Sequence, residues 1–214
     1  MQSPDSTTNN FNGTVTLALT GASGAPYGLR LLECLVKANY HVYLLISPAA
    51  QMVLATESDV KISSRPTEVQ QFFTSLYNAA PNQIKSFGKD QWMAPIASGS
   101  NTASAMVVCP CSAGTLSAIA CGNSDNLIER AADVMIKEQR KLILVPREMP
   151  LSVIHLENML KLARIGVTIM PANPGFYHSP KNISDLVDFV VARILDQLHI
   201  PHTLIPRWGV EAEE

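Results

Sequence analysis

The stretch Thr20-Gly21-Ala22-Ser23-Gly24 has the residue types of an anion-binding turn. It lies between a β-type run at 14–20 and an amphipathic helical segment. Free backbone amides and the helix dipole at such a helix start favour a phosphate group. Ser23 replaces the middle glycine of the dinucleotide motif G-x-G-x-x-G, and no acidic residue between Glu33 and Glu57 could bind a ribose diol. The sequence therefore predicts a phosphorylated ligand near Ser23 and disfavours NAD.

Polar residues also follow three other β-type runs. Ser47 is a helix cap before Pro48 and stands where a dinucleotide enzyme carries its acidic ribose ligand, so it suits a ribityl chain or a flavin edge better. Ser112 alone is typical of a helix cap, but its place on the same rim as Ser23 favours a second polar ligand group. Arg147 and Glu148 could bind phosphate and move protons, although a surface ion pair explains this dipeptide equally well.

The elements that must position these residues alternate along the chain. The β-type runs are 14–20, 40–46, 105–109, 141–146 and 167–170, and the helical patterns are 25–38, 48–57, 66–79, 112–121, 126–139, 152–165 and 182–198. This alternation predicts a single-domain α/β fold, a Rossmann-like or flavodoxin-like sandwich with a mainly parallel sheet. Ligands of such sheets bind beyond the carboxyl ends of the strands, so one rim is expected to collect the polar groups. Residues 1–13 and the acidic end 210–214 are expected as tails of a domain at 14–209.

Composition excludes several classes of protein. With 47% hydrophobic and 16% charged residues, the 214-residue chain can bury a large core, and the low charge favours buried subunit surface as well. A net charge of −2 predicts no broad attraction for nucleic acid or an anionic membrane. No apolar run is long enough to span a bilayer and the polar start lacks signal-peptide features, so we expect a cytoplasmic protein.

The cysteines and histidines show no metal-site spacing. Cys34, Cys109, Cys111 and Cys121 form no C-x-x-C motif and are expected as buried free thiols. Neither H-E-x-x-H nor Asp-Asp-x-x-Asp occurs, which favours metal-independent chemistry.

From about residue 14 to residue 209 the chain closely resembles the flavin prenyltransferases, which make prenylated FMN for a partner decarboxylase of ubiquinone biosynthesis. The matching motifs are Thr20-Gly21-Ala22-Ser23-Gly24-Ala25, Ser47-Pro48-Ala49-Ala50, Ser98-Gly99-Ser100, Pro110-Cys111-Ser112, the segment 126–134, Pro146-Arg147-Glu148-Met149-Pro150-Leu151, Gly175-Phe176-Tyr177-His178 and Arg207-Trp208.

The resemblance implies roles for individual positions. The FMN-binding residues would be Gly21, Ala22, Ser23, Ser47, Ser112, Ala113, Gly114, Thr115 and Arg147. Tyr177 and Arg193 would hold the phosphate of dimethylallyl monophosphate, with Lys137 and Ser23 nearby and Arg130 as a further substrate-binding residue. Glu148 would assist proton transfer, and Glu57 would reach into the site of a neighbouring subunit. Trp92 and Trp208 would wall the prenyl pocket.

The resemblance also implies the reaction. Reduced FMN would be a substrate that is alkylated at N5 by the dimethylallyl carbon and then closed onto C6. Arg, Lys, Tyr and helix N-termini can stabilise a monophosphate leaving group without a metal. The assembly would be a homo-oligomer, a dodecamer with sites at subunit junctions. The choice between monophosphate and diphosphate, and the decarboxylase that receives the product, stay open.

Three other functions remain as alternatives. Flavin-dependent cysteine decarboxylases share the fold but typically carry Pro-x-Ser-Ala-Asn-Thr, where this chain has Gly114 in the asparagine's place. A non-catalytic FMN carrier would need Ser23 and Ser112 but not Glu148. A direct carboxy-lyase for an aromatic acid would need a base or electron sink that no residue pattern here supplies without a modified flavin.

Overall fold

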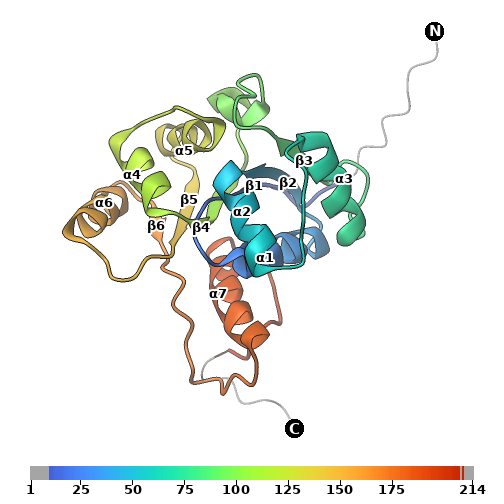
Figure 1. Ribbon diagram of the computed structural model, residues 1–214, viewed down its shortest axis with the longest axis vertical. Coiled ribbons are helices and arrows are strands. Elements are labelled where there is room, and N and C mark those ends of the chain that lie inside the picture. The colour runs from blue at the N-terminus through green and yellow to red at the C-terminus, as the bar shows by residue number, and fades with distance from the viewer. Residues whose placement is uncertain (1–9, 208, 210–214) are drawn as a thin grey trace.

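A six-stranded parallel sheet forms the centre of the structure, a computed structural model that describes residues 10–207 and 209 (Figure 1). The strands are β1 (Thr14–Leu19), β2 (His41–Ile46), β3 (Ile84–Phe87), β4 (Ala105–Cys111), β5 (Lys141–Pro146) and β6 (Thr168–Ile169). Their order, β3-β2-β1-β4-β5-β6, is that of doubly wound nucleotide-binding domains, and it reverses between β1 and β4. The predicted α/β class with a parallel sheet is confirmed.

Helices cover both faces of this sheet (Figure 1). One face packs against α1 (Ala25–Lys37), α2 (Pro48–Glu57), α3 (Pro66–Leu76) and α7 (Ile183–Gln197). The other packs against α4 (Ala113–Cys121), α5 (Leu127–Lys137) and α6 (Val153–Arg164). Two short 3-10 turns, Pro95–Ala97 and Gly99–Asn101, precede β4. Within the described chain no helix is long and apolar enough to cross a membrane.

The two central strands are buried on both sides, as expected for a covered parallel sheet. Every residue of β4 is buried, and in β1 Leu17 faces the core below α1 while Ala18 faces the core below α4 and α5. Gly28 lets α1 approach the sheet closely, because a Cβ at this position would lie 2.6 Å from the carbonyl oxygen of Cys109. The absence of a side chain at Gly28 therefore sets the distance between α1 and β4.

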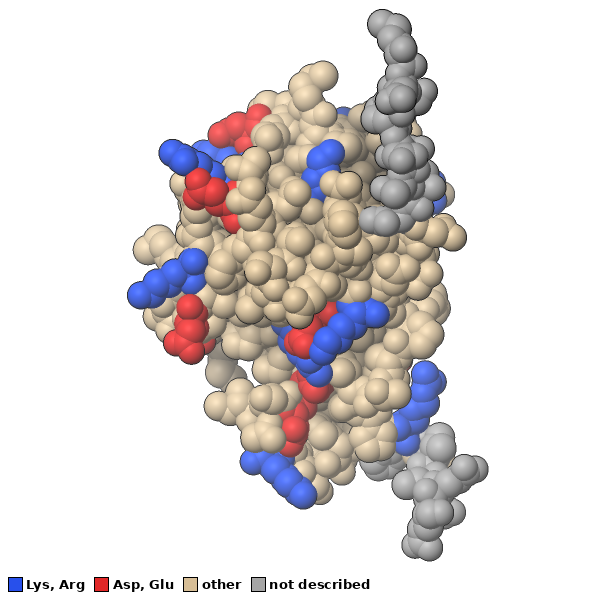
Figure 2. All heavy atoms as spheres, turned by 90° about the vertical axis from the view of Figure 1, so that its right-hand side faces the viewer, with Lys and Arg blue, Asp and Glu red and all other residues tan. Residues whose placement is uncertain are grey.

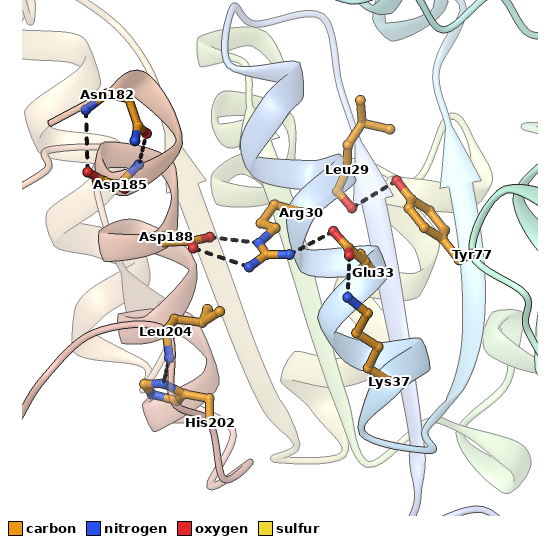
Figure 3. A network of polar contacts seen from close by, with 10 residues as sticks. All are labelled: Leu29, Arg30, Glu33, Lys37, Tyr77, Asn182, Asp185, Asp188, His202 and Leu204. Carbon is orange, nitrogen blue, oxygen red and sulfur yellow. Dashed lines mark hydrogen bonds and ion pairs between the residues drawn. The ribbon is translucent and has the colours of Figure 1, made fainter. Parts of the chain in front are cut away.

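An ion-pair network joins α1 to α7, two helices far apart in sequence (Figure 3). Arg30 donates to both carboxylate oxygens of Asp188, at 2.7 and 3.2 Å, and to Glu33 at 2.8 Å. Glu33 also accepts from Lys37 at 2.6 Å. The bidentate geometry fixes the angle of the guanidinium as well as its distance. The network therefore holds α7, the last helix, against the first.

The structure differs from the sequence predictions in three places. It adds the strand β3, it holds Asn12 by backbone and side-chain hydrogen bonds of 2.9 Å to residues 38 and 39, and it leaves Cys121 exposed. The prediction of buried thiols is thus confirmed for Cys109 and Cys111 and wrong for Cys121, while Cys34 is half-buried. The expected tails at 1–9 and 210–214 lie outside the described residues.

Charged side chains are few on the face of the molecule shown in Figure 2. The two signs lie mostly in small mixed groups rather than in one extended patch, in keeping with the net charge of −2.

Candidate functional site

The carboxyl ends of five strands form one continuous rim. Backbone amides of the loops bind the strand ends next to them: Ser47 to Leu19 at 3.0 Å, Thr20 to Pro110 at 3.1 Å, Arg147 to Cys111 at 3.3 Å, and Ala172 to Pro146 at 3.1 Å. Neighbouring strands lie about 4.8 Å apart, so these contacts set the spacing of the loops. The structure thus brings the predicted loops after β1, β2, β4, β5 and β6 together.

Thr20 connects the two strands at which the sheet order reverses. Its hydroxyl donates to the carbonyl of Pro110 at 2.9 Å and accepts from the amide of Ser112 at 2.8 Å. The side chain is buried, so both bonds are protected from water. Thr20 therefore fixes the start of α4 relative to the glycine-rich turn. The sequence identifies Thr20 only as part of the motif, although a hydroxyl at a strand end is a signal for such a bridge.

The glycine-rich turn after β1 is occupied by a carboxylate. Glu57, the last residue of α2, accepts from the amides of Gly24 at 2.8 Å and Ala25 at 2.9 Å, and from the Ser23 hydroxyl. Burial raises the pKa of Glu57, but these hydrogen bonds and the charge of Arg147 outweigh it, so the pKa lies below its ordinary value. The predicted reach of Glu57 into a neighbouring subunit stays a prediction, since in the structure it caps α1 of its own chain.

The start of α4 is an open anion site. Ser112 caps the helix, accepting from the amide of Thr115 at 3.2 Å and donating to its hydroxyl at 3.0 Å. Within the described chain, the amides of Ala113 and Gly114 make no hydrogen bond, and no atom lies within 4 Å of where a Gly114 Cβ would be. Free amides at a helix N-terminus favour phosphate. The residues present therefore fit the phosphate of FMN.

Arg147 and Glu148 line a cavity of about 490 Å³ next to this site. Its other walls come from the loop after β5, from Met159 on α6, and from Pro171 to Asn173 after β6. Arg147 and Glu148 are both exposed to it. A cation and a carboxylate in one mainly apolar cavity can bind an anionic group and exchange a proton with a ligand.

Tyr177 packs against α7, the helix that carries Arg193. The Tyr177 ring packs against Phe189 with centroids 5.6 Å apart, and Arg193 follows Phe189 by one helical turn, where it pairs with Asp196. Residues four apart on a helix share a face. The phosphate-binding role of this pair stays a prediction, and both residues are linked to the same stretch of α7.

Trp92, Arg130 and Lys137 lie elsewhere, along α5 and the loop before β4. Arg130 donates to the carbonyl of Ala97 at 3.0 Å and to Asp133 at 2.7 Å, and Trp92 is 45% exposed. Lys137 pairs with Glu138 beside Gly99.

The sheet separates Lys137 from Tyr177 and Arg193. The core below α5 is on the opposite face from the core below α7, so the expectation that Lys137 lies near this pair is not met within one chain. Trp208 lies outside the described residues. In the part of the chain that is described, no three His, Cys, Asp or Glu side chains are grouped as metal ligands.

Comparisons of the sequence identify the family of this chain. A family model described as Flavoprotein matches residues 3–195. The chain is 62% identical over 195 residues to the flavin prenyltransferase UbiX of Pseudomonas aeruginosa. This match covers 91% of this chain and 93% of that protein. It is 49% identical over 203 residues to UbiX of Halalkalibacterium halodurans, covering 95% and 97%.

Solved structures give the same result. A dodecameric FMN-dependent UbiX-like decarboxylase from Escherichia coli O157:H7 matches with a TM-score of 0.81 at 40% identity, over 92% of this chain and 100% of that one. AnUbiX (PadA1), solved with FMN and dimethylallyl pyrophosphate, matches with a TM-score of 0.82 at 38% identity, over 93% and 98%. The peptidyl-cysteine decarboxylase EpiD, at 20% identity and a TM-score of 0.51, shares the fold. The chain belongs to the flavin prenyltransferase family of flavoproteins.

Proposed function

We propose that this protein is a flavin prenyltransferase that joins the dimethylallyl group of dimethylallyl monophosphate to N5 and C6 of reduced FMN without a metal. The observation that carries the proposal is the rim, where the free amides at the start of α4 follow β4 and the cavity lined by Arg147 and Glu148 follows the neighbouring strand β5. Its relatives named as flavin prenyltransferases reach 62% identity.

Different residues of the rim bind different parts of FMN. The amides of Ala113 and Gly114 and the cap formed by Ser112 hold the FMN phosphate, while Ser47 and the turn at Gly21 to Ser23 border the flavin. Arg147 binds the flavin from the opposite side of the rim. Reduced FMN supplies the nucleophilic atoms N5 and C6 when it is bound.

The remaining residues act on the allylic substrate. Tyr177 and Arg193 hold its phosphate and stabilise the charge that grows on the leaving oxygen as the carbon–oxygen bond breaks. Glu148 and the Ser23–Glu57 pair hold and move the protons that the ring closure requires at the flavin. The prenylated product goes to a decarboxylase that uses it.

Assembly of the site from several copies explains the positions of Trp92, Arg130 and Lys137. We propose that these residues serve the site of a neighbouring subunit within a dodecamer, like that of the E. coli relative. Apolar side chains exposed on α6, among them Val153 at 68% and Ile154 at 67%, support buried contacts between copies. A particle mass of twelve chains by light scattering is the expected result, and a monomer at micromolar concentration would contradict it.

A redox experiment separates this function from its alternatives. The protein is incubated without oxygen, with a chelator, with reduced or oxidised FMN, and with dimethylallyl monophosphate or diphosphate. A prenyltransferase consumes reduced FMN and leaves oxidised FMN unchanged, whereas a cysteine decarboxylase reduces oxidised FMN when its peptide or pantothenoyl substrate is present. A Glu148→Gln variant that binds FMN but makes no product excludes the carrier.

A further inference from the structure

Three aromatic rings meet where the loop before α7 packs onto that helix. Phe189 of α7 stacks on His178, with centroids 5.3 Å apart and an interplanar angle of 17°. It meets Tyr177 edge to face, at 5.6 Å and 79°. Tyr177 and His178 themselves lie edge to face at 5.9 Å. Phe189 is thus the one ring of α7 that contacts both loop residues.

The loop backbone follows the same ring. A Cβ at Gly175 would lie 2.9 Å from Cζ of Phe189 and 3.1 Å from Cε1 of Tyr177, closer than ordinary van der Waals contact. Gly175 therefore lets the chain pass directly over the end of the Phe189 ring. Residues 175 to 178 therefore pack around the Phe189 side chain.

Ring packing rather than hydrogen bonding orients His178. Both of its ring nitrogens are buried, and neither has a hydrogen-bond partner in the described part of the chain. The ring contacts with Phe189 and Tyr177 therefore orient it, with the charge of Asp185 within electrostatic range. Of its two described ring contacts, the shorter centroid distance is to Phe189.

We propose that Phe189 is a positioning residue that fixes the Tyr177 ring relative to Arg193 and so sets the affinity for the allylic phosphate. Arg193 follows Phe189 by one turn of α7, so the helix carries the cation and the platform for the phenol at a fixed spacing. The inference rests on the proposed function, in which Tyr177 and Arg193 bind that phosphate. In this proposal Phe189 acts on the phosphate through its contact with the Tyr177 ring.

The test compares Phe189→Leu with Phe72→Leu, the same change on α3, where Phe72 packs edge-on against Phe73 at 5.2 Å. Loss of two aromatic contacts is expected to raise KM for dimethylallyl monophosphate about tenfold in the first variant, with kcat and the Kd for FMN within about twofold of the wild type. The Phe72→Leu control keeps all three values. An unchanged KM in Phe189→Leu, or a parallel loss of FMN affinity, overturns the proposal.

A double variant distinguishes positioning from general destabilisation. If Phe189 acts through Tyr177, Phe189→Leu adds little to KM in a Tyr177→Phe background, because the phenol oxygen is already gone. Full additivity contradicts the proposal. If Phe189→Leu does not fold, Gly175→Ala displaces the loop from the other side and is expected to raise KM in the same way.

A binding measurement keeps this inference separate from the reaction itself. Should the wild type make no prenylated flavin, the proposed function fails, and calorimetry with inorganic phosphate then judges Phe189 on its own. Weaker phosphate binding in Phe189→Leu than in Phe72→Leu supports the platform, and equal binding overturns it.

Discussion

Glu57→Gln tests whether a carboxylate of the chain itself caps the glycine-rich turn. The carboxylate accepts from the amides of Gly24 and Ala25 at 2.8 and 2.9 Å and from the hydroxyl of Ser23. Glutamine keeps the length of the side chain and one acceptor oxygen but removes the charge. The change therefore isolates the electrostatic part of the cap.

The expected loss of stability follows from these contacts. A hydrogen bond to a charged group contributes about 1.5–3 kcal/mol against about 0.5–1.5 kcal/mol for a neutral one, and a charge at a helix N-terminus adds roughly 0.3–1 kcal/mol. Solvent screens a partly exposed carboxylate, so we expect a loss of only about 1–2 kcal/mol. For a chain of this size that corresponds to a decrease in Tm of roughly 2–8 °C.

The pH dependence of Tm shows whether the charged form of Glu57 stabilises the fold. Because the pKa of Glu57 is lowered in the folded protein from its ordinary value of 4.5, the charged cap stabilises the fold above that value. This contribution is lost as the pH falls through the folded-state pKa. The difference in Tm between wild type and Glu57→Gln is thus expected to be full at pH 7 and to shrink below about pH 4.5.

Thermal unfolding at equal protein concentration and fixed salt measures both effects, since assembly makes Tm depend on concentration. Asp59→Asn, which removes a negative charge from an exposed carboxyl two residues further on, is the matched control and should leave Tm unchanged. An unchanged Tm in Glu57→Gln at pH 7 would show that the charge of Glu57 does not stabilise the turn. So would a difference in Tm that persists undiminished in acid.

Three further perturbations test the structure around the rim. Thr20→Val removes the buried hydrogen-bond bridge between β1 and β4. It should lower the free energy of unfolding by about 1–3 kcal/mol in denaturant titrations and weaken FMN binding in fluorescence titrations. Unaltered values for both would contradict the bridge. Gly28→Ala should lower the free energy of unfolding by about 1–3 kcal/mol, since its Cβ would lie 2.6 Å from a carbonyl oxygen. Gly114→Ala should not destabilise the fold, because no neighbouring atom lies within 4 Å of its Cβ position. Equal effects of the two variants in urea titrations would argue against close packing at Gly28. Alkylation followed by mass spectrometry at pH 8 should modify exposed Cys121 first, because burial raises the pKa of Cys34 to about 11; faster labelling of Cys34 would disprove this order.

The arrangement of the sheet could be predicted because most strands and helices carry a strong periodic pattern. All seven described helices agree with the expected ranges to within a few residues. β3 was missed because Ile84–Phe87 is short and places only its two end residues in the core, so a polar middle hides the strand. A four-residue edge strand is defined by pairing with β2, which the local sequence does not encode.

The rim could be predicted from strand ends, but side-chain partners could not. Nothing in the sequence places Glu57 at the amides of Gly24 and Ala25, because the contact depends on the angle at which α2 leaves β2. Likewise, the face of the sheet that carries Lys137 is fixed by the crossover after β4. Roles that the resemblance implied for single residues therefore gain or lose support only when the elements are placed in space.

The mass and connectivity of the flavin released after anaerobic turnover test the central claim most directly. Wild-type protein receives reduced FMN and dimethylallyl monophosphate in the presence of a chelator, and the flavin is analysed by mass spectrometry and proton NMR. We expect FMN enlarged by one dimethylallyl unit, bonded at N5 and C6, with one phosphate released for each flavin converted. Unmodified FMN, despite tight binding and a flavin shown to be reduced, would contradict it.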